Sequence, residues 1–426
     1  MRTIDISPLT GVKADKPSPQ PSPKGEGEKE IFPRLPLPKI RLRGHNHPAM
    51  AISNDLETRN DSLPARLRAR IERAGPISFR EWMQAALYDA RDGYYCRPDR
   101  IPQGRAGDYR TAPESSPLFA ATFAWYFSKL FAELFFELGS PPTWTIFEAG
   151  AGGGEFAHGV LSTLKARYPE VFSATSYVID EVSPAARRRA AERLSEFAER
   201  LTFERLVEID NPATAGVCFS NELIDAFPVH RVIMRNGRLS ELCVGLNQDD
   251  FVWVERDPVQ RVAEYCRRVE LQLSEGQIAE INLEAEEFIT RAAGLFNRGF
   301  LITVDYGAER NELLDSPDRF AGTLRAFHRH HLIDDVLVRP GEQDLTTTVD
   351  WTQIKEVGRR AGLRAVRLER LDKFLLSEGL GELLSEMLSQ IQDQVEALRL
   401  SIGAREMIMP HGLAASFQVL VQEKGP

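Results

Sequence analysis

The feature that most constrains the fold is a glycine-rich turn at residues 148–154, which reads E-A-G-A-G-G-G. An apolar stretch over 144–148 predicts a short strand before it, and the spacing of apolar residues over 156–168 predicts a helix after it. Glycines at alternate positions allow positive φ angles and bring the backbone close to a ligand. The first amide groups of the following helix would face the same ligand. The turn therefore predicts a binding site at the carboxyl end of the first strand.

Further strands and helices alternate along the chain. We expect strands over residues 176–180, 216–220 and 300–305, a charged helix over 184–200, and a last strand over 417–421. Strands separated by helices predict an α/β fold with a doubly wound, mostly parallel sheet. Ligands of such sheets bind at the carboxyl ends of the strands.

Composition divides the chain into a tail and a globular part. Residues 1–60 are expected to form a disordered, proline-rich tail, because they bury too little apolar surface to order themselves. We expect a helical N-terminal part over 61–140 and the main domain over 141–426. Helical insertions rich in Glu, Leu and Arg are expected near 255–297 and 370–406.

A phenylalanine stripe marks one of the helices in the N-terminal part. Every fourth residue from Phe119 to Phe135 is a phenylalanine, and this spacing predicts one helical stripe. We interpret the stripe as a helix face packed on the core, with a partner-docking face as the alternative.

Charge and composition exclude several classes of protein. The net charge of −9 argues against a general nucleic-acid binder. The longest nearly apolar run, 118–127, is half of the ~20 residues that a spanning helix needs, so we expect no membrane insertion. The four cysteines are far apart, and the histidines at 328–331 have no Cys or carboxylate spacing that would complete a metal site. We therefore expect no metal.

The composition of the tail is evidence about the cellular compartment of the protein. It has no apolar stretch of the secretory type, and its acidic residues argue against a mitochondrial presequence. We expect a cytoplasmic protein, with the mitochondrial matrix as the alternative. One further hypothesis is that natural translation starts at Met50, because globular patterning begins soon after it.

Two cofactor classes use a glycine turn of this geometry. Dinucleotide folds require a third glycine and an acidic residue ~20 residues further on, and the position of that third glycine is Glu155 in this chain. S-adenosylmethionine folds instead place one acid before the glycines and another at the end of the second strand, and they need no third close-packing glycine. We favour S-adenosylmethionine and keep a dinucleotide or a purely structural turn as alternatives. The expected cofactor residues here are Glu148, Gly150, Gly152, Gly154 and Glu181.

Carboxylates follow the third strand. The sequence S-N-E-L-I-D-A-F-P over 220–228 places Glu222 and Asp225 three residues apart. Three apart on a helical turn puts both side chains on one face. Carboxylates hold a planar guanidinium through paired hydrogen bonds, so the pair favours a cationic substrate such as arginine. The alternative is a helix N-terminus with acids that match its dipole.

A series of ordered motifs extends this interpretation. They are I-S-F-R-E-W-M (77–83), D-G-Y-Y (92–95), G-D-Y-R-T-A-P-E (107–114), the glycine turn, N-E-L-I-D-A-F-P (221–228), V-D-Y-G (304–307), G-T-L-R (322–325), P-G (340–341), D-L-T (344–346) and P-H-G (410–412). In this order they resemble the MidA-type family of S-adenosylmethionine-dependent methyltransferases, over about residues 77–420. Mitochondrial members of that family act as protein-arginine methyltransferases that assist assembly of the respiratory NADH dehydrogenase complex.

The resemblance implies roles for individual residues. The catalytic cleft would hold Asn221, Glu222 and Asp225. A loop over the cofactor would contribute Asp108 and Thr111, in addition to the glycine turn and Glu181. Substrate-binding residues would be Glu114, Asp305, Tyr306 and His330. The implied partner is a protein substrate, such as a subunit of an NADH dehydrogenase.

The sequence departs from the family at three positions. Thr348 stands where the family has a histidine, Ala112 replaces a serine, and Ala414 replaces a glycine. A role of the family histidine therefore does not carry over, and the protein substrate can differ. Two alternatives of other kinds stay open: a non-catalytic assembly factor and a methyltransferase for a small molecule.

Overall fold

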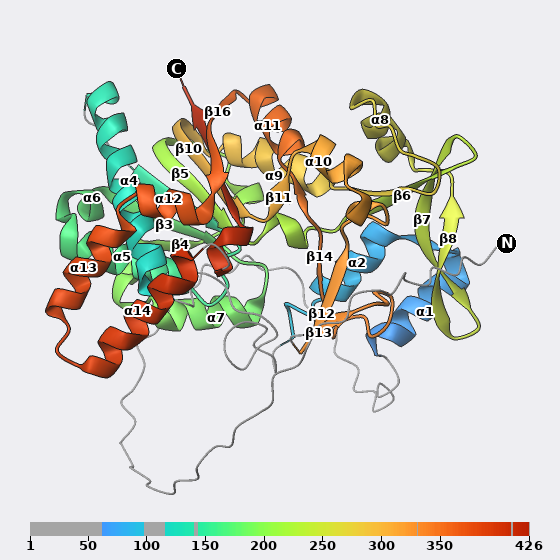
Figure 1. Ribbon diagram of the computed structural model, residues 1–426, viewed down its shortest axis with the longest axis horizontal. Helices are drawn as coiled ribbons and strands as arrows, with labels where there is room; N and C mark the ends of the chain where they lie inside the picture. The colour runs from blue at the N-terminus through green and yellow to red at the C-terminus, as the bar shows by residue number, and fades with distance from the viewer. Residues whose placement is uncertain (1–61, 98–115, 140–143, 330, 410–411, 426) are drawn as a thin grey trace, which may run out of the picture. The chain divides into compact units, whose positions relative to one another are not determined.

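A seven-stranded sheet forms the centre of the described unit (Figure 1). The computed structural model describes residues 62–97, 116–139, 144–329, 331–409 and 412–425, so the tail predicted over 1–60 lies outside it. The order of the strands is β16-β17-β10-β5-β2-β3-β4. Their bounds are β2 (Trp144–Ala149), β3 (Thr175–Asp180), β4 (Leu201–Phe203), β5 (Ala213–Asn221), β10 (Phe296–Asp305), β16 (Leu363–Arg370) and β17 (Gln418–Lys424).

The sheet is mostly parallel, as predicted. The five strands from β10 to β4 are parallel, whereas β17 is antiparallel to both of its neighbours. The predicted strands correspond to β2, β3, β5, β10 and β17, which confirms their positions. Ala149 of β2 pairs with Ser220 of β5, so the glycine turn and the acidic segment begin side by side at one edge of the sheet.

Helices cover both faces of this sheet. Side chains along each strand alternate in direction, so neighbouring residues of a strand pack on different sets of helices. Ile146 and Val217 belong to a core shared with one set of helices, whereas Phe147 and Cys218 belong to a core shared with another. The first set is α4 (Pro117–Leu138), α5 (Glu155–Arg167), α6 (Pro169–Ala174), α7 (Pro184–Arg193), α12 (Leu371–Ser377), α13 (Leu380–Gln390) and α14 (Gln394–Ile408). The second set is α9 (Leu283–Ala293) and α11 (Trp351–Arg360).

The phenylalanine stripe lies on α4 and packs on the core from Phe119 to Phe131, as interpreted from the sequence, whereas Phe135 is 47% exposed. Phe119, Phe123 and Phe127 are fully buried and contact the rings of Phe156 and Phe219. The stripe thus joins α4 to α5 and β5, next to the strand end that carries the acidic segment.

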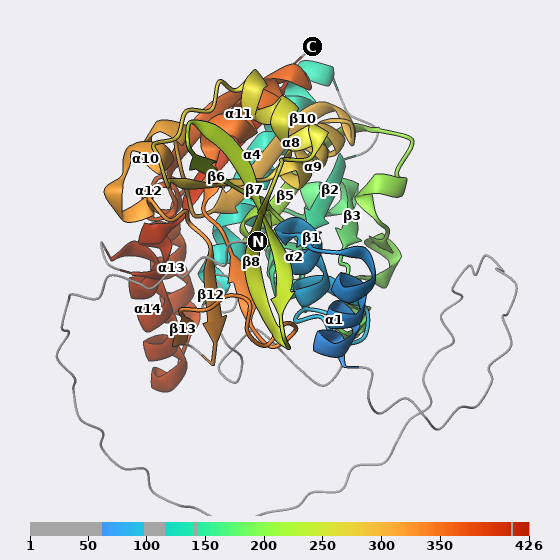
Figure 2. The ribbon, with the colours of Figure 1, turned by 90° about the vertical axis from the view of Figure 1, so that its right-hand side faces the viewer.

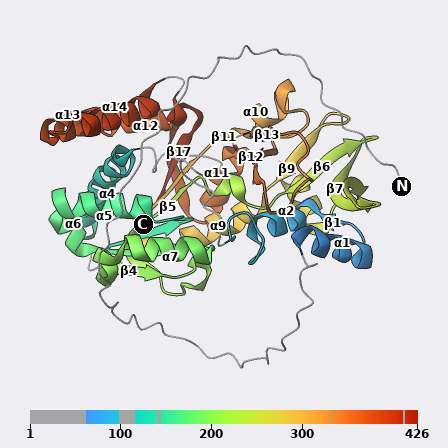
Figure 3. The same ribbon diagram turned by 90° about the horizontal axis from the view of Figure 1, so that it is seen from below.

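A second sheet lies beside the first, at the opposite end from α12, α13 and α14 (Figures 1 and 3), and this sheet faces the viewer in Figure 2. Its order is β1-β7-β6-β9, with β8 paired to β7. It packs on α1 and α2 through residues such as Phe79, Trp82 and Val244. The bounds are α1 (Leu63–Ala74), β1 (Ile77–Ser78), α2 (Phe79–Tyr88), β6 (His230–Arg235), β7 (Arg238–Asn247), β8 (Asp250–Arg256) and β9 (Ile278–Ile281).

This second sheet corrects the prediction of a helical insertion over 255–297. The segment contains α8 (Gln260–Arg268) and α9, but between them Ile278–Ile281 forms β9. β9 is four residues long and pairs with β6, more than 40 residues earlier, so the local sequence carries no periodic signal for it.

Short elements lie between β10 and α11 in the chain. They are β11 (Gly307–Ala308), α10 (Arg310–Asp315), β12 (Arg325–His328), β13 (His331–Ile333), β14 (Asp344–Thr346) and β15 (Val349–Asp350). None of the helices in the described ranges has the length and apolar character needed to cross a membrane. The boundary between an N-terminal part and the main domain at residues 140–141 stays a proposal.

Candidate cofactor and substrate site

The glycine turn disfavours side chains at Gly150 and Gly154. Gly150, Gly152 and Gly154 have φ angles of 73°, 55° and 79°, in the left-handed region that favours glycine. A Cβ atom at Gly150 would lie 2.9 Å from Cδ1 of Leu223, and one at Gly154 would lie 3.1 Å from Cα of Ala190. The turn therefore brings its bare backbone close to the segments that follow β3 and β5.

Glu181 closes the turn from the side. Its carboxylate accepts hydrogen bonds from the N–H groups of Gly152, at 2.8 Å, and Ser183, at 2.7 Å. Burial raises the pKa of Glu181, and the two N–H groups oppose that rise. The preceding Asp180 pairs with Arg205 at 2.7 Å instead. Glu181 is thus a fixed acceptor beside the glycines, as a ribose-binding acid requires.

Two cavities meet at the glycine turn. One of about 80 Å³, which we call the glycine-turn cavity, is lined by Gly150, Gly152, Glu181 and Glu222, among others. The other, of about 280 Å³, opens toward α9, and we call it the α9 cavity. The residues that line both are Tyr88, Gly150, Val182 and Leu223. The two cavities therefore form neighbouring compartments at the carboxyl ends of β2, β3 and β5.

Of the three predicted catalytic residues, Glu222 reaches a cavity. Its N–H group donates to the Val304 carbonyl at 2.9 Å, and Asn221 Nδ2 donates to Glu222 Oε1 at 3.0 Å. Its φ of 51° is an uncommon value for a residue other than glycine. Backbone strain of this kind is found mostly at functional sites.

The structure corrects the expectation that Glu222 and Asp225 share a helical face. Sheet pairing continues through Asn221, the chain then turns at the left-handed Glu222, and a short helix starts at Ile224. Glu222 is therefore outside the helix, and only Asp225 lies on it.

Asp225 is buried behind the cleft and lines neither cavity. Its Oδ2 accepts hydrogen bonds from the hydroxyls of Thr346, at 2.7 Å, and Tyr306. Burial raises the pKa of Asp225, whereas Tyr306, Thr346 and the nearby Arg325 lower it. This group connects the turn after β5 to β14 and to the end of β10.

Asp305 supports the same turn. It is fully buried, and its Oδ2 accepts hydrogen bonds from the N–H groups of Ile224, at 3.1 Å, and Asp225, at 3.3 Å. Burial raises its pKa well above the ordinary value, with a further contribution from Asp225 and Glu222. Asp305 thus holds the backbone of the turn and does not line either cavity.

Glu148 also lies apart from both cavities. It is 4% exposed and accepts a hydrogen bond from the Tyr177 hydroxyl at 2.7 Å. Burial raises the pKa of Glu148 to about 8, although the Tyr177 hydroxyl lowers it. Four predicted site residues, Asp108, Thr111, Glu114 and His330, lie outside the described residues.

Two tyrosines that the sequence analysis did not assign line the glycine-turn cavity. The Tyr88 hydroxyl donates to the Ala226 carbonyl at 3.0 Å, and the Tyr95 hydroxyl donates to Asp344 Oδ1 at 2.7 Å. Both come from the segment that starts with α2, and Tyr95 belongs to the D-G-Y-Y motif. The motif indicated a role in the site, but it is far from Glu222 in the sequence, so the sequence did not predict that both line one cavity.

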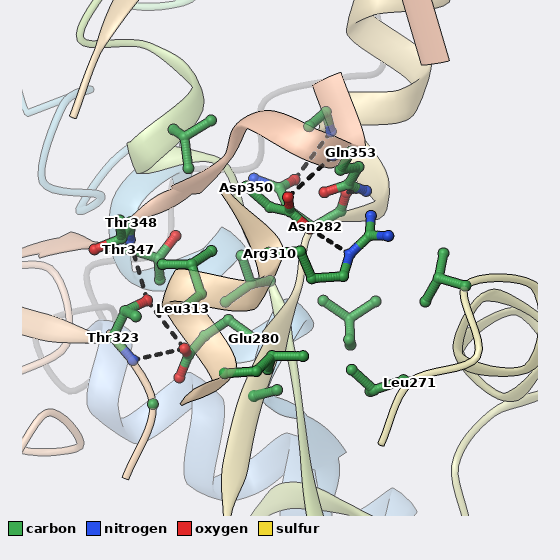
Figure 4. Close-up of a pocket in the computed structure, with 18 of the residues that line it drawn as sticks. Leu271, Glu280, Asn282, Arg310, Leu313, Thr323, Thr347, Thr348, Asp350 and Gln353 are labelled. Carbon is green, nitrogen blue, oxygen red and sulfur yellow. Dashed lines mark hydrogen bonds and ion pairs between the residues drawn. The ribbon is translucent and has the colours of Figure 1, made fainter. Parts of the chain in front are cut away.

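Thr348 lines a third cavity of about 50 Å³ (Figure 4). Its N–H group donates to Thr323 Oγ1 at 3.1 Å, and the Thr323 N–H group donates to Glu280 at 2.7 Å. Across the cavity, Arg310 pairs with Asp350 at 2.8 Å. This cavity shares no lining residue with the other two, so Thr348 lies outside the cleft at the glycine turn. The described part of the chain holds no group of three or more His, Cys, Asp or Glu arranged to bind a metal.

Comparisons with known proteins identify the family of the chain. Residues 127–368 match the family described as "Putative S-adenosyl-L-methionine-dependent methyltransferase". The chain is 28% identical over 339 residues to "Protein arginine methyltransferase NDUFAF7 homolog, mitochondrial" of Drosophila melanogaster, covering 73% of each chain. It is 26% identical over 389 residues to "Protein arginine methyltransferase NDUFAF7, mitochondrial" of Danio rerio, covering 84% of this chain and 86% of the relative.

A solved structure shows the same fold with a product of the cofactor. A Burkholderia thailandensis protein bound to S-adenosyl-homocysteine has a TM-score of 0.72 and 29% identity, covering 85% of this chain and 91% of that one. The residues here fit S-adenosylmethionine, because Gly150 and Gly152 line a cavity together with Glu181, whose carboxylate is a fixed acceptor. The chain belongs to this family and is an S-adenosylmethionine-dependent methyltransferase.

Proposed function

We propose that the enzyme methylates a side-chain nitrogen of arginine in a protein. The observation that carries the proposal is the position of Glu222, whose carboxylate lines the same cavity as Glu181 and the glycine turn. A carboxylate beside the methyl donor suits a cationic acceptor. The names of the Drosophila and zebrafish relatives, both called protein arginine methyltransferases, support the same acceptor.

The residues of the cleft divide the work. When bound, S-adenosylmethionine supplies an electrophilic methyl group. Gly150 and Gly152 would border it, and Glu181 would accept hydrogen bonds from its ribose hydroxyls. Glu222 would hold the guanidinium through N–H···O bonds and accept the proton that the attacking nitrogen loses. Holding the two reactants in line can contribute ~7–11 kcal/mol to lowering the barrier.

Other predicted residues act through Glu222 in this proposal. Asn221 holds the Glu222 carboxylate at 3.0 Å. Asp225, Asp305 and Tyr306 fix the turn that follows, so we propose them as positioning residues. For the loop outside the described ranges, we keep Asp108 and Thr111 as cofactor residues, and Glu114 and His330 as substrate residues. Glu148 would act at most through the strand that carries the glycine turn.

We further propose that the methylated protein is a subunit of an NADH dehydrogenase. This proposal rests on the family resemblance. The relatives are named as mitochondrial proteins, which supports the matrix over the cytoplasm as the place of action.

The proposal is tested by transfer of an isotope-labelled methyl group. The full chain and labelled S-adenosylmethionine are incubated in separate reactions with purified NADH dehydrogenase, with a cell lysate and with a metabolite extract, and the products, including digested proteins, are analysed by mass spectrometry. We expect methylarginine in one subunit, and much less of it with the Glu181→Ala variant at a cofactor concentration near the wild-type Kd. Label on another residue type, or only in added metabolites, would overturn the arginine assignment. Label on arginine of a different protein would retain the chemistry and exclude the dehydrogenase.

A further inference from the structure

The aromatic pair Tyr88–Tyr95 forms one side of the glycine-turn cavity. The ring centroids are 5.5 Å apart, and Tyr94 supports Tyr95 from behind with an edge-to-face contact at 5.1 Å. Each hydroxyl is fixed: Tyr88 donates to the Ala226 carbonyl and Tyr95 to Asp344. The rings are therefore held by contacts at both ends, which keeps their orientation in the cavity.

The two tyrosines differ in what else they line. Tyr88 lines both the glycine-turn cavity and the α9 cavity, whereas Tyr95 lines only the glycine-turn cavity, the one that contains Glu222. Tyr88 thus lies at the junction of the compartments. Tyr95 lies in the compartment that Glu222 also lines.

The surroundings of the pair are acidic. Glu181 and Glu222 line the same cavity, and Asp344 accepts the Tyr95 hydroxyl hydrogen bond. Burial is the main cause that raises the pKa of Tyr88 well above its ordinary value, and the charges of Asp225, Asp344 and Glu181 raise it further. A cation that enters this cavity therefore meets the carboxylates of Glu181 and Glu222 and the two tyrosines, with Arg189 as a basic residue among the lining residues. Ring faces attract cations, and the planar guanidinium stacks on them especially well.

We infer that the ring of Tyr95, supported by Tyr88, binds the guanidinium of the substrate by cation–π contact while Glu222 binds its N–H groups. This inference rests on the proposed function. It assigns Tyr95 as a specificity-determining residue that prefers a planar cation to a neutral group of the same shape.

The test separates binding from turnover. A short peptide with one central arginine, and the same peptide with citrulline, are titrated into the protein saturated with S-adenosylhomocysteine. Citrulline has nearly the shape of arginine but no charge. Tyr95 is replaced by phenylalanine and by phenylalanine carrying one, two or three ring fluorines, which withdraw charge from the ring face with little change in shape. Tyr168→Phe is the matched control, because Tyr168 is a half-buried tyrosine outside both cavities.

We expect the wild-type protein and Tyr95→Phe to prefer the arginine peptide. Each added fluorine should weaken arginine binding, to about a tenfold total loss, with no change for citrulline. Tyr168→Phe should match wild type. A constant affinity along the fluorine series overturns the inference, and so does equal binding of the two peptides by wild type.

A parallel titration distinguishes the two cations of the reaction. A different outcome is that the fluorine series weakens the binding of S-adenosylmethionine but not of S-adenosylhomocysteine, and leaves the affinity for the arginine peptide unchanged. In that case the ring recognises the sulfonium and the inference is wrong. Turnover is measured separately on the dehydrogenase. If arginine is methylated but the affinity for the arginine peptide stays constant along the fluorine series, only the role of Tyr95 is overturned. If that affinity falls with each fluorine but no arginine is methylated, only the proposed reaction is overturned.

Discussion

Glu181 Oε2 accepts a hydrogen bond from the Gly152 N–H group at 2.8 Å, so the acid after β3 is tied to the glycine turn after β2. The same carboxylate accepts a second N–H group, from Ser183, at 2.7 Å. These contacts hold the carboxylate in place before a ligand arrives. A ribose hydroxyl then finds an acceptor whose position costs little further ordering.

We expect Glu181→Ala to weaken cofactor binding strongly. A hydrogen bond to a charged group contributes roughly 1.5–3 kcal/mol, which corresponds to a rise of about 10- to 150-fold in the Kd for S-adenosylhomocysteine. Isothermal titration calorimetry measures that Kd directly. Glu192→Ala, an exposed glutamate on α7, is the matched control and should bind as wild type does. An unchanged Kd for S-adenosylhomocysteine in Glu181→Ala would show that Glu181 does not bind the cofactor.

We expect Gly154→Ala to destabilise the fold more than Gly237→Ala. Both glycines have positive φ angles, 79° and 72°, so both variants lose about 1–2 kcal/mol through the backbone. A Cβ at Gly154 also presses on Ala190 at 3.1 Å, whereas one at Gly237 meets nothing within 4 Å. Urea unfolding should therefore show an extra loss of about 1 kcal/mol or more for Gly154→Ala. Equal losses would mean that the contact with α7 relaxes freely.

Glu148 gives a prediction about pH. Burial raises its pKa from 4.5 in the unfolded chain to about 8 in the folded protein. Between those values the folded state binds the proton more tightly, so the contribution of Glu148 to stability is fully present below about pH 4.5 and is lost as the pH rises to about 8. Glu148→Gln keeps an acceptor for the Tyr177 hydroxyl and removes the titration.

The measurement compares urea unfolding of wild type and Glu148→Gln at about pH 5 and about pH 9. We expect the stability of the variant relative to wild type to increase at the higher pH, by several kcal/mol at most. The comparison cancels the other titrating groups. A constant difference between the two proteins would show that Glu148 ionises in the fold as it does in water.

Thr346→Val should lower turnover without affecting cofactor binding. It removes one of the two hydroxyl donors of the buried Asp225 carboxylate, which costs roughly 1–3 kcal/mol of stability and loosens the turn after Glu222. We expect a lower kcat with an unchanged Kd for S-adenosylhomocysteine. Thr122→Val is the control, because Thr122 is buried too but bonds only within α4. A kcat equal to wild type for Thr346→Val would separate Asp225 from the reaction.

The sequence revealed the parts of the site that are local in the chain. The glycine turn, the acid at Glu181 and the acid at Glu222 each follow a strand within a few residues, so pattern and position were enough to find them. The parallel sheet followed from the same alternation of strands and helices.

Contacts between distant segments were not predictable in this way. Tyr95 meets the cavity of Glu222 from the N-terminal segment, and Asp225 is held by Thr346, 121 residues later. No local period marks such pairs. The left-handed turn at Glu222 arises from a hydrogen bond to Val304 in a neighbouring strand, so a helical spacing rule gave the wrong face for Asp225.

The most direct test of the proposed chemistry is a single-turnover assay of Glu222→Gln beside wild type, with cofactor binding measured on the same samples. Glutamine keeps the size of the side chain but cannot accept the proton or offset the charge of the guanidinium. We expect methyl transfer to arginine to slow by about 100-fold or more, with the Kd for S-adenosylmethionine within about twofold of wild type. Full activity in Glu222→Gln would contradict the assignment of Glu222 as the residue that receives the methyl acceptor.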